Sequence, residues 1–90
     1  MAKAEISWKR QTEDGKPLQV YAQHFGRDWI FYARERRYDL WQEVEDPPLE
    51  DWLELLDAVR RRINRKKQRP EEEGRIIKRI RERYPDAEIS

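Results

Sequence analysis

Apolar and polar residues alternate along residues 4–44, and short turn-forming stretches interrupt this period-two pattern. Alternation puts successive side chains on opposite faces of an extended strand, so it predicts β-structure with one buried face. The interruptions divide the segment into four strands, at about 4–12, 16–25, 28–34 and 37–44. Short loops join neighbouring strands in antiparallel pairs, so we expect a four-stranded antiparallel meander.

The first turn sets the pairing of the first two strands. Glu13, Asp14 and Gly15 are expected to form a three-residue loop in which Gly15 takes the left-handed conformation. This loop pairs Trp8 with Val20. A two-residue Asp-Gly turn would slip the register by one residue and separate the apolar side chains of the two strands, so we reject it.

The second turn sets the pairing of the second and third strands. Residues 26–27, Gly-Arg, suit a type II′ hairpin turn, which favours glycine at its first central position. The resulting register pairs Ala22 with Phe31 on one face of the sheet. Tyr21 and Tyr32 then meet on the opposite face.

Residues 34–37 separate the third and fourth strands and contain no glycine. A four-residue loop there pairs Ala33 with Tyr38 and Phe31 with Leu40. These registers define two faces. The core face is expected to hold Ile6, Trp8, Leu18, Val20, Ala22, Trp29, Phe31, Ala33, Tyr38, Leu40 and Val44. The outer face is expected to hold Lys9, Tyr21, Gln23, Ile30, Tyr32, Asp39 and Trp41.

Two helices are expected after the strands, at about residues 47–66 and 70–84. Asp46 is the expected N-cap of the first helix, with a proline in the first turn. The apolar stripe of this helix, which we expect to pack on the core face, consists of Leu49, Trp52, Leu53, Leu56, Val59 and Ile63. Pro70 opens the second helix and Pro85 limits it. Its narrower stripe consists of Ile76, Ile77, Ile80 and Tyr84.

The composition is compatible with one small α+β domain of 90 residues. Charged residues make up 43% of the chain, but the net charge is only +1 and four Trp, four Tyr and two Phe supply large groups to bury. The sequence contains no Cys and no apolar run of the roughly 18 residues that a membrane span needs. We therefore expect a cytoplasmic protein without a membrane partner.

Residues 60–69 contain seven basic residues and no acidic one. Basic side chains stabilise the C-terminal end of a helix, and Asp57 can pair with Arg61 one turn later. This effect fades within about one turn, so it does not account for the whole run. The alternative is a contact with the phosphates of a nucleic acid. The candidate residues for that contact are Arg61, Arg62, Arg65, Lys66 and Arg69.

Three aromatic residues, Tyr21, Tyr32 and Trp41, are expected on the outer face and need an explanation. The second helix can bury them. They can also stack the bases of a single-stranded nucleic acid, as aromatic sheet faces do in single-strand binders. A third interpretation is a protein partner or a second copy of the chain, because exposed aromatic patches mark interfaces.

No catalytic or metal-binding constellation is expected. His24 is the single histidine, lies opposite Trp29 beside a hairpin and is expected to be structural. The chain has two Ser, one Thr and no Gly-rich phosphate loop, so no cofactor and no small-molecule substrate is expected. The predicted function is therefore non-catalytic binding. The sequence favours nucleic acid at the basic end of the first helix, or alternatively a protein partner or homodimer at the outer face.

Overall fold

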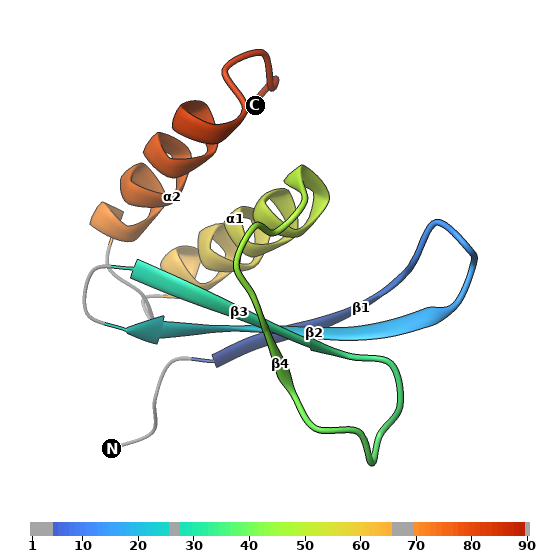
Figure 1. Ribbon diagram of the computed structural model, residues 1–90. Coiled ribbons are helices and arrows are strands. Elements are labelled where there is room, and N and C mark those ends of the chain that lie inside the picture. Colours follow the sequence, from blue (N-terminus) through green and yellow to red (C-terminus); the bar gives the residue numbers. More distant parts are fainter. Residues whose placement is uncertain (1–4, 26–27, 66–69, 90) are drawn as a thin grey trace. The chain divides into compact units, whose positions relative to one another are not determined.

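The computed structural model describes residues 5–25, 28–65 and 70–89, which form four antiparallel strands followed by two helices (Figure 1). This is the predicted α+β arrangement. The elements are β1 (Glu5–Gln11), β2 (Pro17–Phe25), β3 (Asp28–Arg34), β4 (Gln42–Val44), α1 (Leu49–Asn64) and α2 (Pro70–Arg83). The chain divides into two compact units, Met1–Pro47 and Pro48–Ser90, and each is described by itself. That the chain is one domain, with α1 on the core face, stays a prediction.

The sheet unit has the strand order β1-β2-β3-β4, as a meander requires. The predicted registers of β1 with β2 and of β2 with β3 are confirmed, since Trp8 pairs with Val20 and Ala22 pairs with Phe31. Gly15 has a φ of +80°, the left-handed conformation expected for it. The residues of the predicted Gly26-Arg27 turn lie outside the described part of the chain.

The predicted fourth strand is wrong in length and in register. It covers only Gln42–Val44 instead of residues 37–44. Phe31 pairs with Val44 rather than with Leu40, and Ala33 pairs with Gln42 rather than with Tyr38. Tyr38 and Leu40 are accordingly 77% and 87% exposed and do not belong to the core face.

A local turn explains the displaced register. The backbone N–H of Arg36 donates to Oδ2 of Asp39 at 3.0 Å, and the N–H of Asp39 donates to the Arg36 carbonyl at 2.9 Å. These bonds occupy backbone groups that a longer strand would need for its ladder. The displacement is four residues, an even number, so Val44 still lies on the core-face side of the sheet and Trp41 on the outer side.

The core face of the sheet is confirmed for the residues of the first three strands that pack most tightly. Its buried members are Ile6, Val20, Ala22, Trp29 and Phe31. Trp8 is half-buried, and its ring meets the Phe31 ring edge to face with centroids 6.0 Å apart. Edge-to-face pairs of this kind add to the stability that area burial provides.

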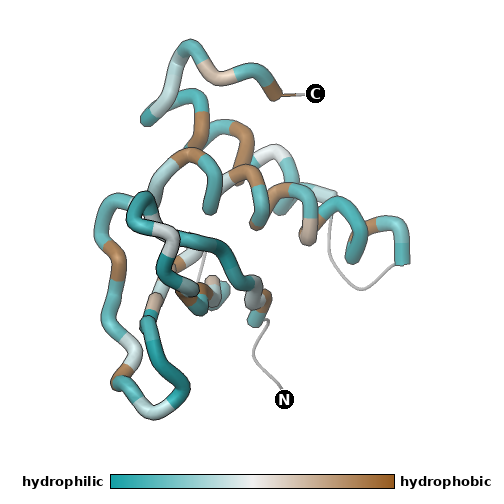
Figure 2. The backbone as a smooth tube through the Cα atoms, turned by 90° about the vertical axis from the view of Figure 1, so that its right-hand side faces the viewer, coloured by the Kyte–Doolittle hydropathy of each residue, from teal (hydrophilic) through white to brown (hydrophobic). Residues whose placement is uncertain are grey.

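The helical unit is a hairpin in which α1 and α2 pack side by side (Figure 1). Figure 2 shows hydrophobic residues recurring at intervals along the helices, between hydrophilic ones. The apolar residues buried in this unit are Trp52, Leu55, Leu56, Val59, Ile76 and Ile80. Leu55 was not in the predicted stripe, whereas Leu53 and Ile63 were and are only half-buried.

The start of α1 differs from the prediction. The helix begins at Leu49, Pro48 is the N-cap with φ −66° and ψ 160°, and no side chain caps the helix. Asp46 is therefore not the N-cap, because two consecutive prolines hold the chain extended before the helix can begin. Asp51, an acidic residue in the first turn of α1, is 1% exposed.

Truncating the side chain of Phe31 tests the assignment of the core face. Phe31 is 2% exposed, so we expect Phe31→Ala to lower the free energy of unfolding by about 3–5 kcal/mol. Leu40→Ala is the matched control, because that side chain is 87% exposed and its loss should change stability by less than about 0.5 kcal/mol. Urea denaturation of both variants measures the difference. Equal effects of the two substitutions would contradict the register of β3 with β4.

Candidate functional site

The basic end of α1 is one candidate site, and its geometry is partly as the sequence suggested. Arg61 and Arg62 lie in the last turn of the helix, and Arg65 is its C-cap residue. The backbone N–H of Arg65 donates to the carbonyls of Arg61 and Arg62 at 3.3 and 3.2 Å. Lys66 and Arg69, the other two predicted contact residues, lie outside the described part of the chain.

Ion pairs engage some of these cations. Nη2 of Arg61 lies 3.3 Å from Oδ2 of Asp57, the pair that the sequence predicted, and both side chains are more than 60% exposed. Arg60 pairs through Nε with Glu73 of α2. No acidic side chain within residues 5–25, 28–65 and 70–89 pairs with Arg65, which is exposed. Among the described residues, the basic end therefore contains Arg65 without an acidic partner, and the ion pair of Arg61 with Asp57, which solvent screens and which adds little stability.

The outer face of the sheet is the second candidate site. The rings of Tyr21 and Tyr32 stack with centroids 4.8 Å apart and planes 17° apart. The Trp41 ring lies 4.6 Å from the Tyr21 ring at 88°. Cζ of Arg34 lies 4.2 Å from the centroid of the Trp41 ring, and Nε of Arg34 donates to Oε1 of Gln19 at 2.7 Å. The structure thus brings all three predicted aromatic residues together and adds a guanidinium group.

The geometry of this aromatic cluster limits what it can bind. Tyr21 and Tyr32 turn ring faces toward each other, and the Arg34 guanidinium covers one face of Trp41. A nucleobase stacks on an open ring face, so these contacts remove the facing sides of Tyr21 and Tyr32 and one face of Trp41 from the base-stacking interpretation. All three rings are half-buried, and the polar groups of Arg34 and Gln19 lie beside them. Such a surface is typical of protein interfaces, where Tyr, Trp and Arg are enriched.

Sequence analysis missed Arg34 and Gln19 as members of this cluster. Both pair across β2 and β3, and a hollow beside them is lined by Ser7, Trp8, Lys9, Gln19, Val20, Arg34 and Trp41. Gln19 and Arg34 are direct cross-strand neighbours, so the correctly predicted register contained the signal. The placement of Trp41 against Arg34 depends on the loop before β4, and the sequence contains no pattern that predicts it.

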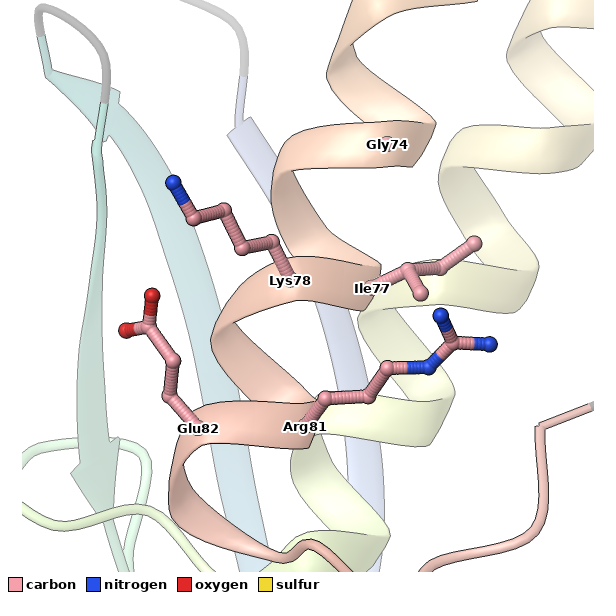
Figure 3. A pocket seen from close by; sticks show the side chains of 5 residues that line it. All are labelled: Gly74, Ile77, Lys78, Arg81 and Glu82. Atoms are coloured by element: carbon pink, nitrogen blue, oxygen red, sulfur yellow. The ribbon is translucent and has the colours of Figure 1, made fainter.

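A second hollow lies on the exposed side of α2. It is lined by Gly74, Ile77, Lys78, Arg81 and Glu82 (Figure 3). Figure 3 shows the Lys78 and Glu82 side chains extending to one side of the helix and Ile77 and Arg81 to the other. A Cβ at Gly74 would contact nothing within 4 Å, and the Ile77 side chain is half-exposed.

His24 packs against Trp29 with ring centroids 4.9 Å apart and planes 47° apart. Among the residues that the structure describes, no group of three His, Asp or Glu side chains is arranged to hold a metal ion. Within the same residues, neither helix combines the length and hydropathy needed to cross a bilayer.

Comparison with known proteins leaves both candidate sites without a precedent. No family model, no curated protein and no solved structure matches the chain. The two candidate sites alone therefore support the proposed function.

The hydroxyl of Tyr21 gives a pH test of the outer face. Burial raises the pKa of Tyr21 above its ordinary value, and Tyr32 and Glu5 raise it further. The folded state then binds the phenolic proton more tightly than the unfolded state, so its stabilising contribution is present below about pH 10 and is lost as the pH rises through the folded pKa. We expect the melting temperature of the wild type to fall more steeply above about pH 10 than that of Tyr21→Phe. Parallel melting curves would contradict the burial of this hydroxyl.

Proposed function

We propose that this chain is a non-catalytic binding domain that contacts nucleic acid through the basic end of α1. Phosphate contacts need exposed cations that lose little by exchanging their present partners. Arg65 is exposed and has no acidic partner in the described ranges, and Arg61, one helical turn earlier, holds only a screened surface pair with Asp57. This pair of neighbouring, available guanidinium groups carries the proposal. We include in this proposal the cytoplasmic location that is expected from the sequence.

Ion pairs within the hairpin distinguish the basic end of α1 from two other cations, Arg60 and Arg75. Arg60 is held by Glu73, and Arg75 is held by Glu72 at 2.9 Å. Glu72 is buried, so its pair with Arg75 is less screened than the pair of Arg61 with Asp57. A phosphate approaching the helical unit would therefore displace the partner of Arg61 more readily than the partner of Arg75, and Arg65 has no acidic partner in the described ranges to displace.

Salt dependence of oligonucleotide binding tests this proposal. Three to five phosphate contacts give a slope of log affinity against log salt of roughly −2 to −4.5. Arg61→Glu combined with Arg65→Glu should flatten the slope by about 1.4–1.8 and weaken binding equally on all sequences, since phosphate contacts carry no base information. Fluorescence anisotropy with labelled oligonucleotides at about 50 and about 200 mM salt measures both effects.

The matched control is Lys16→Glu combined with Arg37→Glu, which changes the net charge by the same amount on exposed loop residues. This control should keep the slope of the wild type. An equal loss in the control would show that only net charge matters and would contradict a site on α1. Absence of wild-type binding at the lower salt concentration would end the nucleic-acid proposal.

A second candidate function is protein docking at the outer face of the sheet. The observation that favours it is the cluster of Tyr21, Tyr32, Trp41 and Arg34, whose side chains pack on one another and combine aromatic rings with a guanidinium group. Rigid aromatic residues lose little conformational entropy on binding, and interface hot spots are rich in these residue types.

Site-specific photo-crosslinking tests the docking candidate. A benzophenone side chain replaces Tyr32, whose ring it resembles, and a control protein carries it at Lys16 in the exposed turn before β2. We expect adducts of discrete mass from position 32 and none from position 16, because only the outer face is an interface. Absence of adducts from position 32 would contradict docking there.

A further inference from the structure

The outer face of the sheet has its charges separated along the strand direction. The registers align three rows of outer-face residues across the sheet. One row contains Lys9, Gln19 and Arg34, the central row contains Ser7, Tyr21, Tyr32 and Glu43, and the last row contains Glu5, Gln23 and Ile30. Lys9 and Glu5 are both exposed. They stand four residues apart on β1, about 13 Å, which is too far for them to pair within the chain.

Across β1, β2 and β3 this arrangement is complementary to itself, whereas Glu43 of β4 lies over its own counterpart. A twofold axis along the central row places a second copy face to face with the first and reverses the strand direction. Lys9 of each copy then lies over Glu5 of the other, and Gln19 lies over Gln23. The end of the sheet that carries Arg34 and Trp41 lies over Ile30, which is half-buried. The aromatic pair of the central row, Tyr21 and Tyr32, meets its own counterpart at the axis.

We propose that the outer face of the sheet binds a second copy of this chain in an isologous, twofold-symmetric dimer. The inference rests on the protein-docking candidate above and names its partner. An isologous contact repeats every pair twice, so the interface contains two contacts of Lys9 with Glu5. Two antiparallel sheets pack face to face at about 10 Å, a distance that aromatic side chains from both faces fill.

The size of the face sets the strength of this dimer. The seven paired residues of each of β1, β2 and β3 present a footprint of roughly 350 Å². A stable complex buries about 800 Å² on each partner, so the footprint corresponds to a weak interface. We therefore expect a dissociation constant in the micromolar range, with a monomer at low concentration and a dimer at high concentration.

Sedimentation velocity of charge-reversed variants tests the proposal. Lys9→Glu places glutamate over Glu5 of the other copy, and Glu5→Lys places lysine over Lys9, so each variant alone should dimerise about tenfold or more weakly than the wild type. An equimolar mixture of the two variants should recover the dimer, because both contacts between residues 5 and 9 again join opposite charges. Both substitutions are at exposed positions, and circular dichroism confirms that each variant is folded.

The double variant with Glu5→Lys and Lys9→Glu in one chain gives an independent control. It should dimerise with itself as the wild type does, and it should not form mixed dimers with the wild type. Single variants that dimerise like the wild type would overturn the proposal, and so would a mixture that fails to recover the dimer. A wild type that stays monomeric up to about 500 µM would also overturn it.

The outcomes separate this inference from the proposed functions. A monomeric wild type whose position-32 adducts differ from twice the mass of the chain would leave docking in place and overturn self-association. The sedimentation samples contain no oligonucleotide, so a failure of nucleic-acid binding at Arg61 and Arg65 does not alter the result of the sedimentation experiment. Association that disappears after nuclease treatment would show nucleic acid bridging two copies and would overturn the dimer.

Discussion

The register of β1, β2 and β3 is the constraint on which the rest of the sheet depends. A strand has a side-chain period of two, so a slip of one residue would bring Tyr21 into the core and expose Val20. The turn at Gly15 prevents that slip between β1 and β2, because its left-handed φ closes a three-residue loop. The register that buries Phe31 also stacks Tyr21 on Tyr32, so the core and the outer surface have the same origin.

The two candidate sites use their charges in opposite ways. At the end of α1, cations accumulate along one helix and are only partly offset by Asp57 and Glu73. A polyanion suits such a surface, because it can exchange with weak surface pairs. On the first three strands of the sheet, Lys9 and Arg34 stand at one end of the outer face and Glu5 stands at the other, with aromatic rings between them. The partner that we propose for such a surface is a second copy of the chain and not a polyanion.

Buried carboxylates show how far local rules extend. Acidic residues in the first turn of a helix are expected to face solvent and to stabilise the helix dipole. Asp51 and Glu72 lie in such turns but are 1% and 4% exposed, and Arg75 compensates Glu72 with a hydrogen bond of 2.9 Å. Only the carboxylate of this pair is buried, because the Arg75 side chain is 45% exposed, so solvent screens the pair in part.

Sequence alone determined the element order, the pairing of the first three strands and the aromatic membership of the outer face. Each of these follows from period-two or period-3.6 patterns and from turn chemistry, which act over a few residues. Tertiary structure alone decided the seven-residue loop before β4, the burial of Asp51 and the contact of Arg34 with Trp41. A hydrogen-bonded turn at Arg36 and Asp39 competes there with strand pairing. The balance between them depends on how many ladder bonds and packed side chains each alternative gains, and a local pattern does not contain that sum.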